Sequence, residues 1–246
     1  MTVTSPTGSP RLPARAVLLP GTGSDADFVV RAFGSALSAA GIELVAVDPY
    51  PADVVAGYLA ALDEAAETPG ELLVGGISLG AAVAARWALH HQQRLTGMLI
   101  ALPAWIGSPE GAPASSSARH SAERLRQLGL AAVLEEVRRS SPAWLSAELS
   151  RAWQRQWPDL PQSLDDAAAQ PGPTEQELAN LRVPTGVVGA VDDAVHPLTV
   201  AQQWAGASPA AALATVHLDE LGANPGVLGA ACVRSWRKAS KCLSAG

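Results

Sequence analysis

Short apolar runs alternate along this chain with segments whose apolar residues recur at helical spacing. The runs lie, in order, at residues 16–19, 42–47, 71–77, 97–102, 184–189 and 213–218. Between them, as in residues 25–40 and in a final segment at about 225–239, apolar side chains recur every three or four positions, which is the spacing of an amphipathic helix. Strands that are apolar on both faces and alternate with helices indicate a parallel sheet that helices cover. The predicted fold class is therefore α/β, with a mostly parallel sheet flanked by helices.

The alternation stops between residues 103 and 181, where no strand pattern is evident. Helical spacing predicts helices at 119–139 and 142–153 instead. We therefore expect a helical cap or lid over residues 103–181, inserted into a core formed by the segments on either side of it. The predicted organisation is a flexible N-terminal tail at 1–13, a core at 14–102 and 182–240, and the cap between the two core segments.

Charge and cysteine content exclude several classes of protein. The chain carries 17 basic and 23 acidic residues, a net charge of −6, which argues against a nucleic-acid or anionic-membrane partner because such partners select basic faces. The two cysteines, Cys232 and Cys242, provide neither a disulfide framework nor metal-ligand spacing. The first residues contain no apolar segment of a secretory signal. We expect a cytoplasmic protein that uses no metal and no cofactor, with its oligomeric state left open.

The most informative motif is the pentapeptide Gly76-Ile77-Ser78-Leu79-Gly80. It lies where a buried strand is predicted to end and a helix to begin, which is the context of a nucleophile elbow. In such a turn the serine hydroxyl projects above the sheet at the helix N-terminus, and the glycines permit close approach of strand and helix. The alternative is a glycine-rich turn in which Ser78 only caps the helix.

With this elbow the chain resembles the α/β-hydrolase superfamily, and the resemblance covers about residues 15–239. It implies that Ser78 is the nucleophile. It also implies that the N–H groups of Thr22, in the loop after the first strand, and of Leu79 form the oxyanion hole. The alternative for Gly21-Thr22-Gly23 is a tight turn, or a phosphate loop without its lysine.

The resemblance places the catalytic acid in the loop after the strand at residues 184–189. Asp192 lies three residues after Gly189, at the usual position for this acid, and the neighbouring Asp193 is the second choice. The acid would orient an imidazole and stabilise the imidazolium that forms. A solvated turn or a helix cap is the alternative for both carboxylates.

The expected base is the feature in which this sequence departs from the family. The superfamily order is serine, acid, histidine, with histidine after the last strand, but this chain has Ala223 at that position. Three explanations remain open: a substitution that makes an inactive or trapping form, a natural non-catalytic member that binds a ligand, or a base from elsewhere in the chain. Five histidines are candidates for the last role. His196 lies closer in sequence to Asp192 than usual triad geometry favours but stays open as a base, and His217, His120, His90 and His91 are less favoured.

The implied reaction is acyl transfer to water from a small-to-medium ester, thioester or amide, a small-molecule acyl substrate. In the cap, Trp105 and Trp144 are candidate substrate-binding residues, and His196 is expected at the rim of the site. The alternative for the tryptophans is packing of the cap onto the core. The alternative function is a non-catalytic, ligand-binding protein of the same fold.

Overall fold

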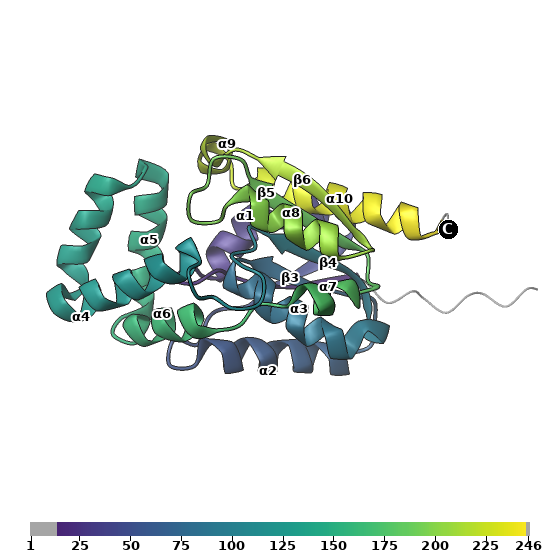
Figure 1. Ribbon diagram of the computed structural model, residues 1–246, viewed down its shortest axis with the longest axis horizontal. Coiled ribbons are helices and arrows are strands. Elements are labelled where there is room, and N and C mark those ends of the chain that lie inside the picture. The colour runs from purple at the N-terminus through teal and green to yellow at the C-terminus, as the bar shows by residue number, and fades with distance from the viewer. Residues whose placement is uncertain (1–13, 245–246) are drawn as a thin grey trace, which may run out of the picture.

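The computed structural model of the chain describes residues 14–244 (Figure 1). The tail expected at residues 1–13 lies outside the described residues. The elements, in chain order, are β1 (Ala14–Leu19), α1 (Ala26–Ser38), β2 (Ile42–Ala46), α2 (Val54–Glu67), β3 (Leu72–Ile77), α3 (Leu79–His91), the 3₁₀ turn η1 (Gln92–Arg94), β4 (Leu95–Ala101), α4 (Pro113–Ser140), α5 (Ala143–Gln156), α6 (Leu160–Ala169), α7 (Glu175–Ala179), β5 (Thr185–Ala190), α8 (Leu198–Ala207), β6 (Ala211–Val216), α9 (Leu218–Ala223) and α10 (Gly226–Ser244).

The strands form one six-stranded sheet in the order β2-β1-β3-β4-β5-β6. Every neighbouring pair is parallel. Each apolar run of the sequence contributes one of these strands, so the predicted fold class is confirmed. The strand that precedes Ser78, β3, lies between β1 and β4, and all its residues are buried. The serine therefore leaves the sheet near its centre, at the carboxyl ends of the strands.

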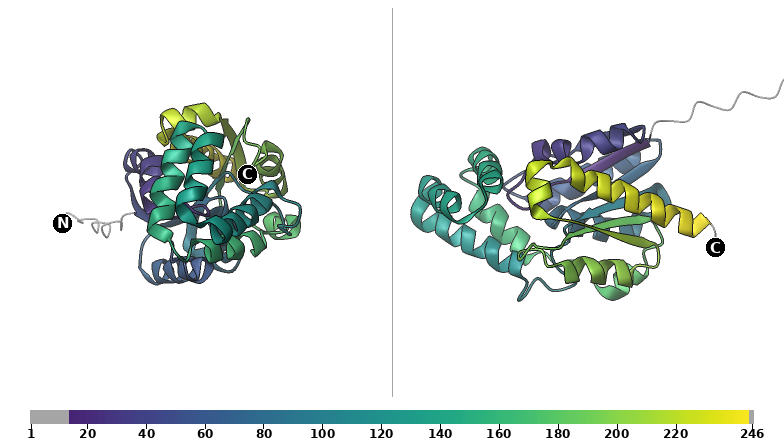
Figure 2. Two further views of the ribbon diagram at one scale, coloured as in Figure 1. Left: turned by 90° about the vertical axis from the view of Figure 1, so that its left-hand side faces the viewer. Right: turned by 90° about the horizontal axis from the view of Figure 1, so that it is seen from above.

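Helices cover both faces of the sheet. Successive residues of a strand point to opposite faces, and because both sets are apolar, both faces must be buried. Val17 and Leu19 of β1 belong to one hydrophobic cluster, together with residues of α2, α3 and α8, whereas Ala16 and Leu18 belong to a second cluster, with residues of α1 and α10. Trp204 of α8 is buried in the first of these clusters. Figure 2 shows the sheet between the two helical layers. Burial on both faces explains why the strands read as continuous apolar runs.

Between β4 and β5 the chain forms α4, α5, α6 and the short α7. Three of these helices have a hydrophobic core of their own, formed by Ala122, Leu125, Val133, Leu134, Ala152, Trp153, Leu160 and Leu164. Figure 1 shows them at one end of the sheet, away from the C-terminus of the chain. The predicted helices at 119–139 and 142–153 correspond to α4 and α5, while α6 and α7 were not predicted because α6 has a proline in its first turn and α7 has only five residues.

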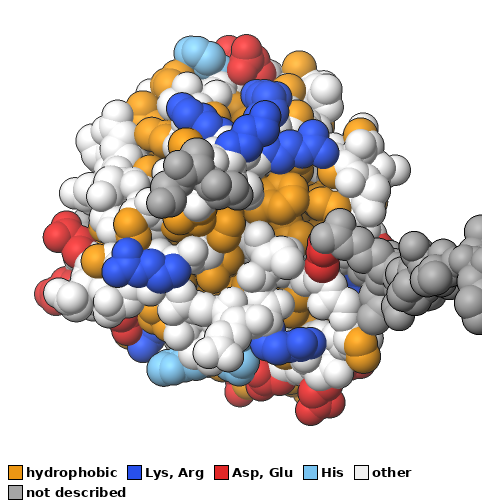
Figure 3. Space-filling model, turned by 90° about the vertical axis from the view of Figure 1, so that its right-hand side faces the viewer, with side chains coloured by type: hydrophobic (Ala, Val, Ile, Leu, Met, Phe, Trp, Pro, Cys, Tyr) orange, Lys and Arg blue, Asp and Glu red, His pale blue; other side chains and the backbone are white. Residues whose placement is uncertain are grey.

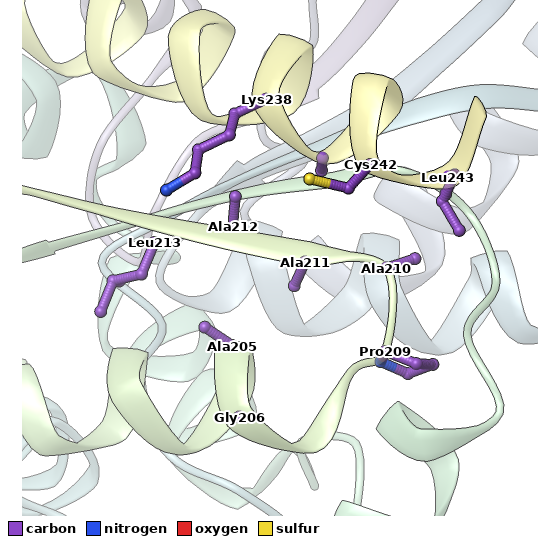
Figure 4. A pocket seen from close by; sticks show the side chains of 11 residues that line it. Ala205, Gly206, Pro209, Ala210, Ala211, Ala212, Leu213, Lys238, Cys242 and Leu243 are labelled. Atoms are coloured by element: carbon purple, nitrogen blue, oxygen red, sulfur yellow. The ribbon is translucent and has the colours of Figure 1, made fainter. Parts of the chain in front are cut away.

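Two cavities lie away from Ser78. One, of about 500 Å³, opens between the start of β6, the end of α8 and the end of α10, and small apolar side chains line most of it (Figure 4). This cavity lies toward the end of the molecule that carries the end of α10, and Figure 3 shows that end, where Lys and Arg side chains lie beside hydrophobic surface. The other cavity, of about 340 Å³, lies among α2, α3 and α7. Neither is lined by Ser78 or His196.

Among the described residues, no helix combines the length and apolar character needed to cross a membrane.

Candidate active site

Ser78 lies on a sharp turn between β3 and α3. Its backbone is in the left-handed region, with φ 53° and ψ −112°, a strained conformation for a residue other than glycine. The flanking glycines are required by packing: a Cβ atom built on Gly76 or on Gly80 would lie 2.4 or 2.3 Å from the Leu19 carbonyl oxygen of β1. The elbow geometry expected from the pentapeptide is therefore present. The serine is only 9% exposed.

The imidazole of a histidine is hydrogen-bonded to the Ser78 hydroxyl. His196 Nε2 lies 3.0 Å from Ser78 Oγ, although the two residues are 118 positions apart in the sequence. His196 comes from the loop at residues 191–197, between β5 and α8, and its side chain is 19% exposed. His196, which was expected at the rim of the site, is therefore hydrogen-bonded to the candidate nucleophile.

The second ring nitrogen of His196 contacts a carboxylate. Its Nδ1 lies 2.9 Å from Oδ2 of Asp193, three residues earlier in the same loop. The other oxygen, Oδ1, accepts the backbone N–H groups of Val195, at 2.8 Å, and of His196, at 3.0 Å. An ionised carboxylate can only accept, so Nδ1 carries a proton, and in the neutral ring Nε2 is then free to accept the Ser78 hydroxyl proton.

Asp193 is held in its ionised form. Burial by itself would raise the pKa of this carboxyl, but the hydrogen bond and charge of His196, together with the amides of Val195 and His196, outweigh it and keep the pKa below its usual value. The side chain is 10% exposed. The loop thus presents a fixed negative charge to the far side of the imidazole.

The structure corrects the expectation that Asp192 orients the base. Its Oδ1 accepts the backbone N–H of Leu218 at 2.9 Å, and its Oδ2 lies 3.7 Å from His217 Nδ1. The side chain is 43% exposed. The consecutive carboxylates point in different directions, because the turn directs Asp193 inward onto its own loop and Asp192 outward to the start of α9. The second choice, Asp193, holds the position on the imidazole.

Ala223, the position at which the base was expected, is the last residue of α9 and is exposed. Ser78 nevertheless has an imidazole partner, which the loop after β5 supplies. His217, expected within the last strand, lies instead just after β6 as the residue that caps α9, with a side chain 60% exposed. It pairs with Asp192 and does not contact Ser78.

The loop after β1 passes directly over Ser78. A Cβ atom built on Gly21 would lie 3.4 Å from Ser78 Cβ, and the Ser24 N–H donates to the Gly21 carbonyl at 3.0 Å, closing a tight turn around Thr22. Leu79 is the first residue of α3, so its N–H has no acceptor within the helix. Within residues 14–244, neither the Thr22 nor the Leu79 N–H donates a hydrogen bond to the protein. Both amides remain candidates for an oxyanion hole.

The two candidate substrate-binding tryptophans, Trp105 and Trp144, are held by contacts with neighbouring protein segments. The Trp105 indole donates to the Gln170 carbonyl at 3.2 Å, and the Trp105 carbonyl accepts from the Trp204 indole at 3.0 Å. Trp144, on α5, packs against Gly222 of α9, where a built Cβ would lie 2.3 Å from its ring. Neither indole hydrogen-bonds Ser78 or His196. Both indoles link the inserted helices to neighbouring segments.

One group of carboxylates in the described part of the chain has metal-ligand spacing: Asp25, Asp27 and Glu148. Three arginines pair with them: Arg31, Arg151 and Arg155. These cations neutralise the negative charge that a metal ion would require. The group is therefore an ion-pair network that joins α1 to α5.

Asp193 and His196, each a candidate but not predicted as a pair, do leave a signal in the sequence. An aspartate and a histidine three positions apart follow a buried strand, immediately before Pro197 and a helix. This spacing permits one short turn to supply both groups.

Comparison with known proteins supports the fold. No family model matches the sequence, and no curated protein matches it. A hydrolase from Oleispira antarctica is 14% identical, with a TM-score of 0.66 over 83% of this chain and 82% of that chain. A thermophilic esterase from Thermogutta terrifontis is 22% identical, with a TM-score of 0.61 over 92% and 90%. The enol-lactonase from Burkholderia xenovorans is 16% identical, with a TM-score of 0.60 over 94% and 90%. The chain has the α/β-hydrolase fold.

Proposed function

We propose that this protein is a serine hydrolase that transfers an acyl group from a small-to-medium ester, thioester or amide to water. The observation that carries the proposal is the continuous hydrogen-bond chain from Asp193 through His196 to Ser78. The similarity in fold to an esterase and an enol-lactonase supports it. The base in this proposal is His196, so the alanine at position 223 does not make the protein inactive.

In the first half-reaction, Ser78 Oγ forms a bond to the acyl carbon while its proton passes to His196 Nε2. The carbonyl oxygen becomes an oxyanion, which accepts hydrogen bonds from the backbone N–H groups of Thr22 and Leu79. Collapse of this intermediate breaks the bond to the leaving group, which takes the proton from His196.

In the second half-reaction, water attacks the acyl-serine and gives one proton to His196, which returns it to Ser78 as the acid departs. Throughout both steps, the Asp193 carboxylate stabilises the imidazolium and fixes the Nδ1 proton. The lowered pKa of Asp193 keeps this carboxylate ionised at neutral pH.

The test combines turnover with labelling. Hydrolysis of p-nitrophenyl butyrate is measured for the unchanged protein, with Ser78→Ala as the blank, and a fluorophosphonate probe is used with peptide mapping. We expect turnover well above the blank and a single adduct, on Ser78. No adduct and no turnover would contradict the proposal. Binding of apolar acids without chemistry would then favour the ligand-binding alternative.

A further inference from the structure

The inserted helix α5 contacts the loop that passes over Ser78. Three consecutive loop residues are each contacted by a different α5 side chain. A Cβ atom built on Gly23 would lie 2.6 Å from the Trp153 indole nitrogen. Gln156 donates its side-chain N–H to the Ser24 carbonyl at 2.9 Å. The helix thus holds the part of the loop that immediately follows Thr22.

The third contact is an ion pair with Asp25. Both terminal nitrogens of Arg151 donate to its carboxylate, at 2.6 and 2.8 Å. Asp25 is 2% exposed and also caps α1 by accepting the Phe28 N–H at 3.2 Å. A two-pronged bond of this kind fixes direction as well as distance.

The charge on Asp25 depends on α5. Burial alone would raise the pKa of this carboxyl, but the Arg151 guanidinium, with the Phe28 amide and the charge of Arg155, lowers it below its usual value. Without Arg151 a buried carboxylate would lose its two closest donors, and the loop would have to move toward solvent to hydrate it.

The other end of the loop is fixed by the core. The Tyr58 hydroxyl donates to the Pro20 carbonyl at 3.2 Å, and Gly21 rests against Ile77 and Ser78. Thr22 is therefore held between a start anchored on the sheet layer and an end anchored on α5. Its amide direction is set by both.

We propose that Arg151 and Gln156 are positioning residues for catalysis, which hold the loop so that the Thr22 N–H faces the oxyanion that forms at Ser78. This inference rests on the proposed hydrolase function and extends it to the inserted helices. An oxyanion donor must lie within a few tenths of an ångström of its best position, so loosening the loop lowers the rate of chemistry more than the affinity for substrate.

The experiment compares Arg151→Gln and Gln156→Leu with Arg155→Gln as the matched control. Arg155 lies on the same helix and is 57% exposed, and its nitrogens lie 3.5 Å from Asp25 and 3.7 Å from Asp48. For each protein, kcat and KM for p-nitrophenyl butyrate are measured, with competent sites counted by end-point fluorophosphonate labelling of Ser78. Affinity for a trifluoromethyl ketone, which forms an oxyanion on the serine, is measured alongside thermal unfolding.

For Arg151→Gln we expect kcat per labelled site to fall by about 10- to 100-fold and KM to change by less than about threefold. Ketone affinity should fall in parallel with kcat, with a smaller loss for Gln156→Leu and little change for Arg155→Gln. Unchanged kcat and ketone affinity in Arg151→Gln would overturn the inference, even if its Tm falls. Equal losses in Arg155→Gln would also overturn it. Absence of labelling in the unchanged protein would instead contradict the hydrolase function, and the inference with it.

Discussion

Two neighbouring segments at the carboxyl ends of the strands differ in what they present to Ser78. The loop at residues 191–197, after β5, places His196 on the serine and Asp193 on His196. The segment after β6, α9, ends at the exposed Ala223, and Trp144 of α5 covers its Gly222. One hydrogen bond, from the Leu218 N–H to Asp192, joins the two segments.

The order of residues along the chain therefore does not by itself indicate which side chains meet at Ser78. The family order leads to α9 for the base, yet the hydrogen bonds lie in the preceding loop. A triad is defined by which atoms meet, and unrelated chain orders reach the same geometry. In this protein one turn supplies both a carboxylate and an imidazole to the chain of hydrogen bonds that ends at Ser78, and Asp192 instead bonds the start of α9.

The largest effect is expected when the imidazole of each segment, His196 or His217, is removed in turn, which tests which segment supplies the base. For His196→Ala we expect kcat to fall by about 10⁴- to 10⁶-fold, because Ser78 loses the acceptor of its proton. The matched control, His217→Ala, should keep nearly full activity, since this ring is 60% exposed and lies beside Asp192. Both are measured by p-nitrophenyl butyrate turnover. A large loss in His217→Ala with little loss in His196→Ala would assign the base to the other segment.

The adjacent carboxylates give the next largest contrast. Asp193→Asn should lower kcat by about 10²- to 10⁴-fold, because an amide neither fixes the Nδ1 proton nor stabilises an imidazolium. Asp192→Asn should stay within about threefold of the unchanged protein, apart from weakening the contact with Leu218. Steady-state kinetics on the two variants decide the matter, and a reversed ranking would restore Asp192 as the acid.

A smaller effect is expected on stability at the contact between α5 and the loop after β1. Because the folded pKa of Asp25 is lowered, its contribution is present at neutral pH and is lost as pH falls below about 4 through the folded value. Asp25→Asn should lower the free energy of unfolding by about 2 kcal/mol at pH 7, and the deficit should shrink at pH 3.

Urea unfolding at the two pH values measures this difference. Asp27→Asn is the control, since Asp27 has a side chain 48% exposed. An Asp25→Asn deficit that is as large at pH 3 as at pH 7 would contradict the assigned pKa direction.

The smallest expected effect comes from Ala223→His. With His196 already on Ser78, the new imidazole should leave kcat within about threefold, as exposed substitutions usually do. The sharper version is the double variant His196→Ala with Ala223→His, which we expect to remain as inactive as His196→Ala. Recovery of turnover in the double variant would show that the two segments are interchangeable as sources of the base.

Much of the fold could be predicted from the sequence because buried strands and helices each require a characteristic spacing of apolar residues. The apolar runs gave the strands and fold class, and the glycines around Ser78 gave the elbow, since backbone contacts with Leu19 leave no room for a side chain. The helices α6 and α7 were not predicted, because α6 has a proline in its first turn and α7 has only five residues, too few to show a helical period. His217 was assigned to a strand that in fact ends one residue earlier.

The site divides in the same way. The amino-acid sequence alone was enough to predict that a serine lies on a strained turn between β3 and α3, because the turn depends on Ser78 and its neighbours in the chain. Which imidazole lies in hydrogen-bond contact with that serine, and which carboxylate with that imidazole, follows instead from the packing of distant segments. His196 and Ser78 meet across 118 positions, and Asp192 and Asp193 differ in the direction in which one turn points each side chain. Periodicity reports which residues are buried, whereas a catalytic hydrogen bond depends on atomic positions that the packing of distant segments sets.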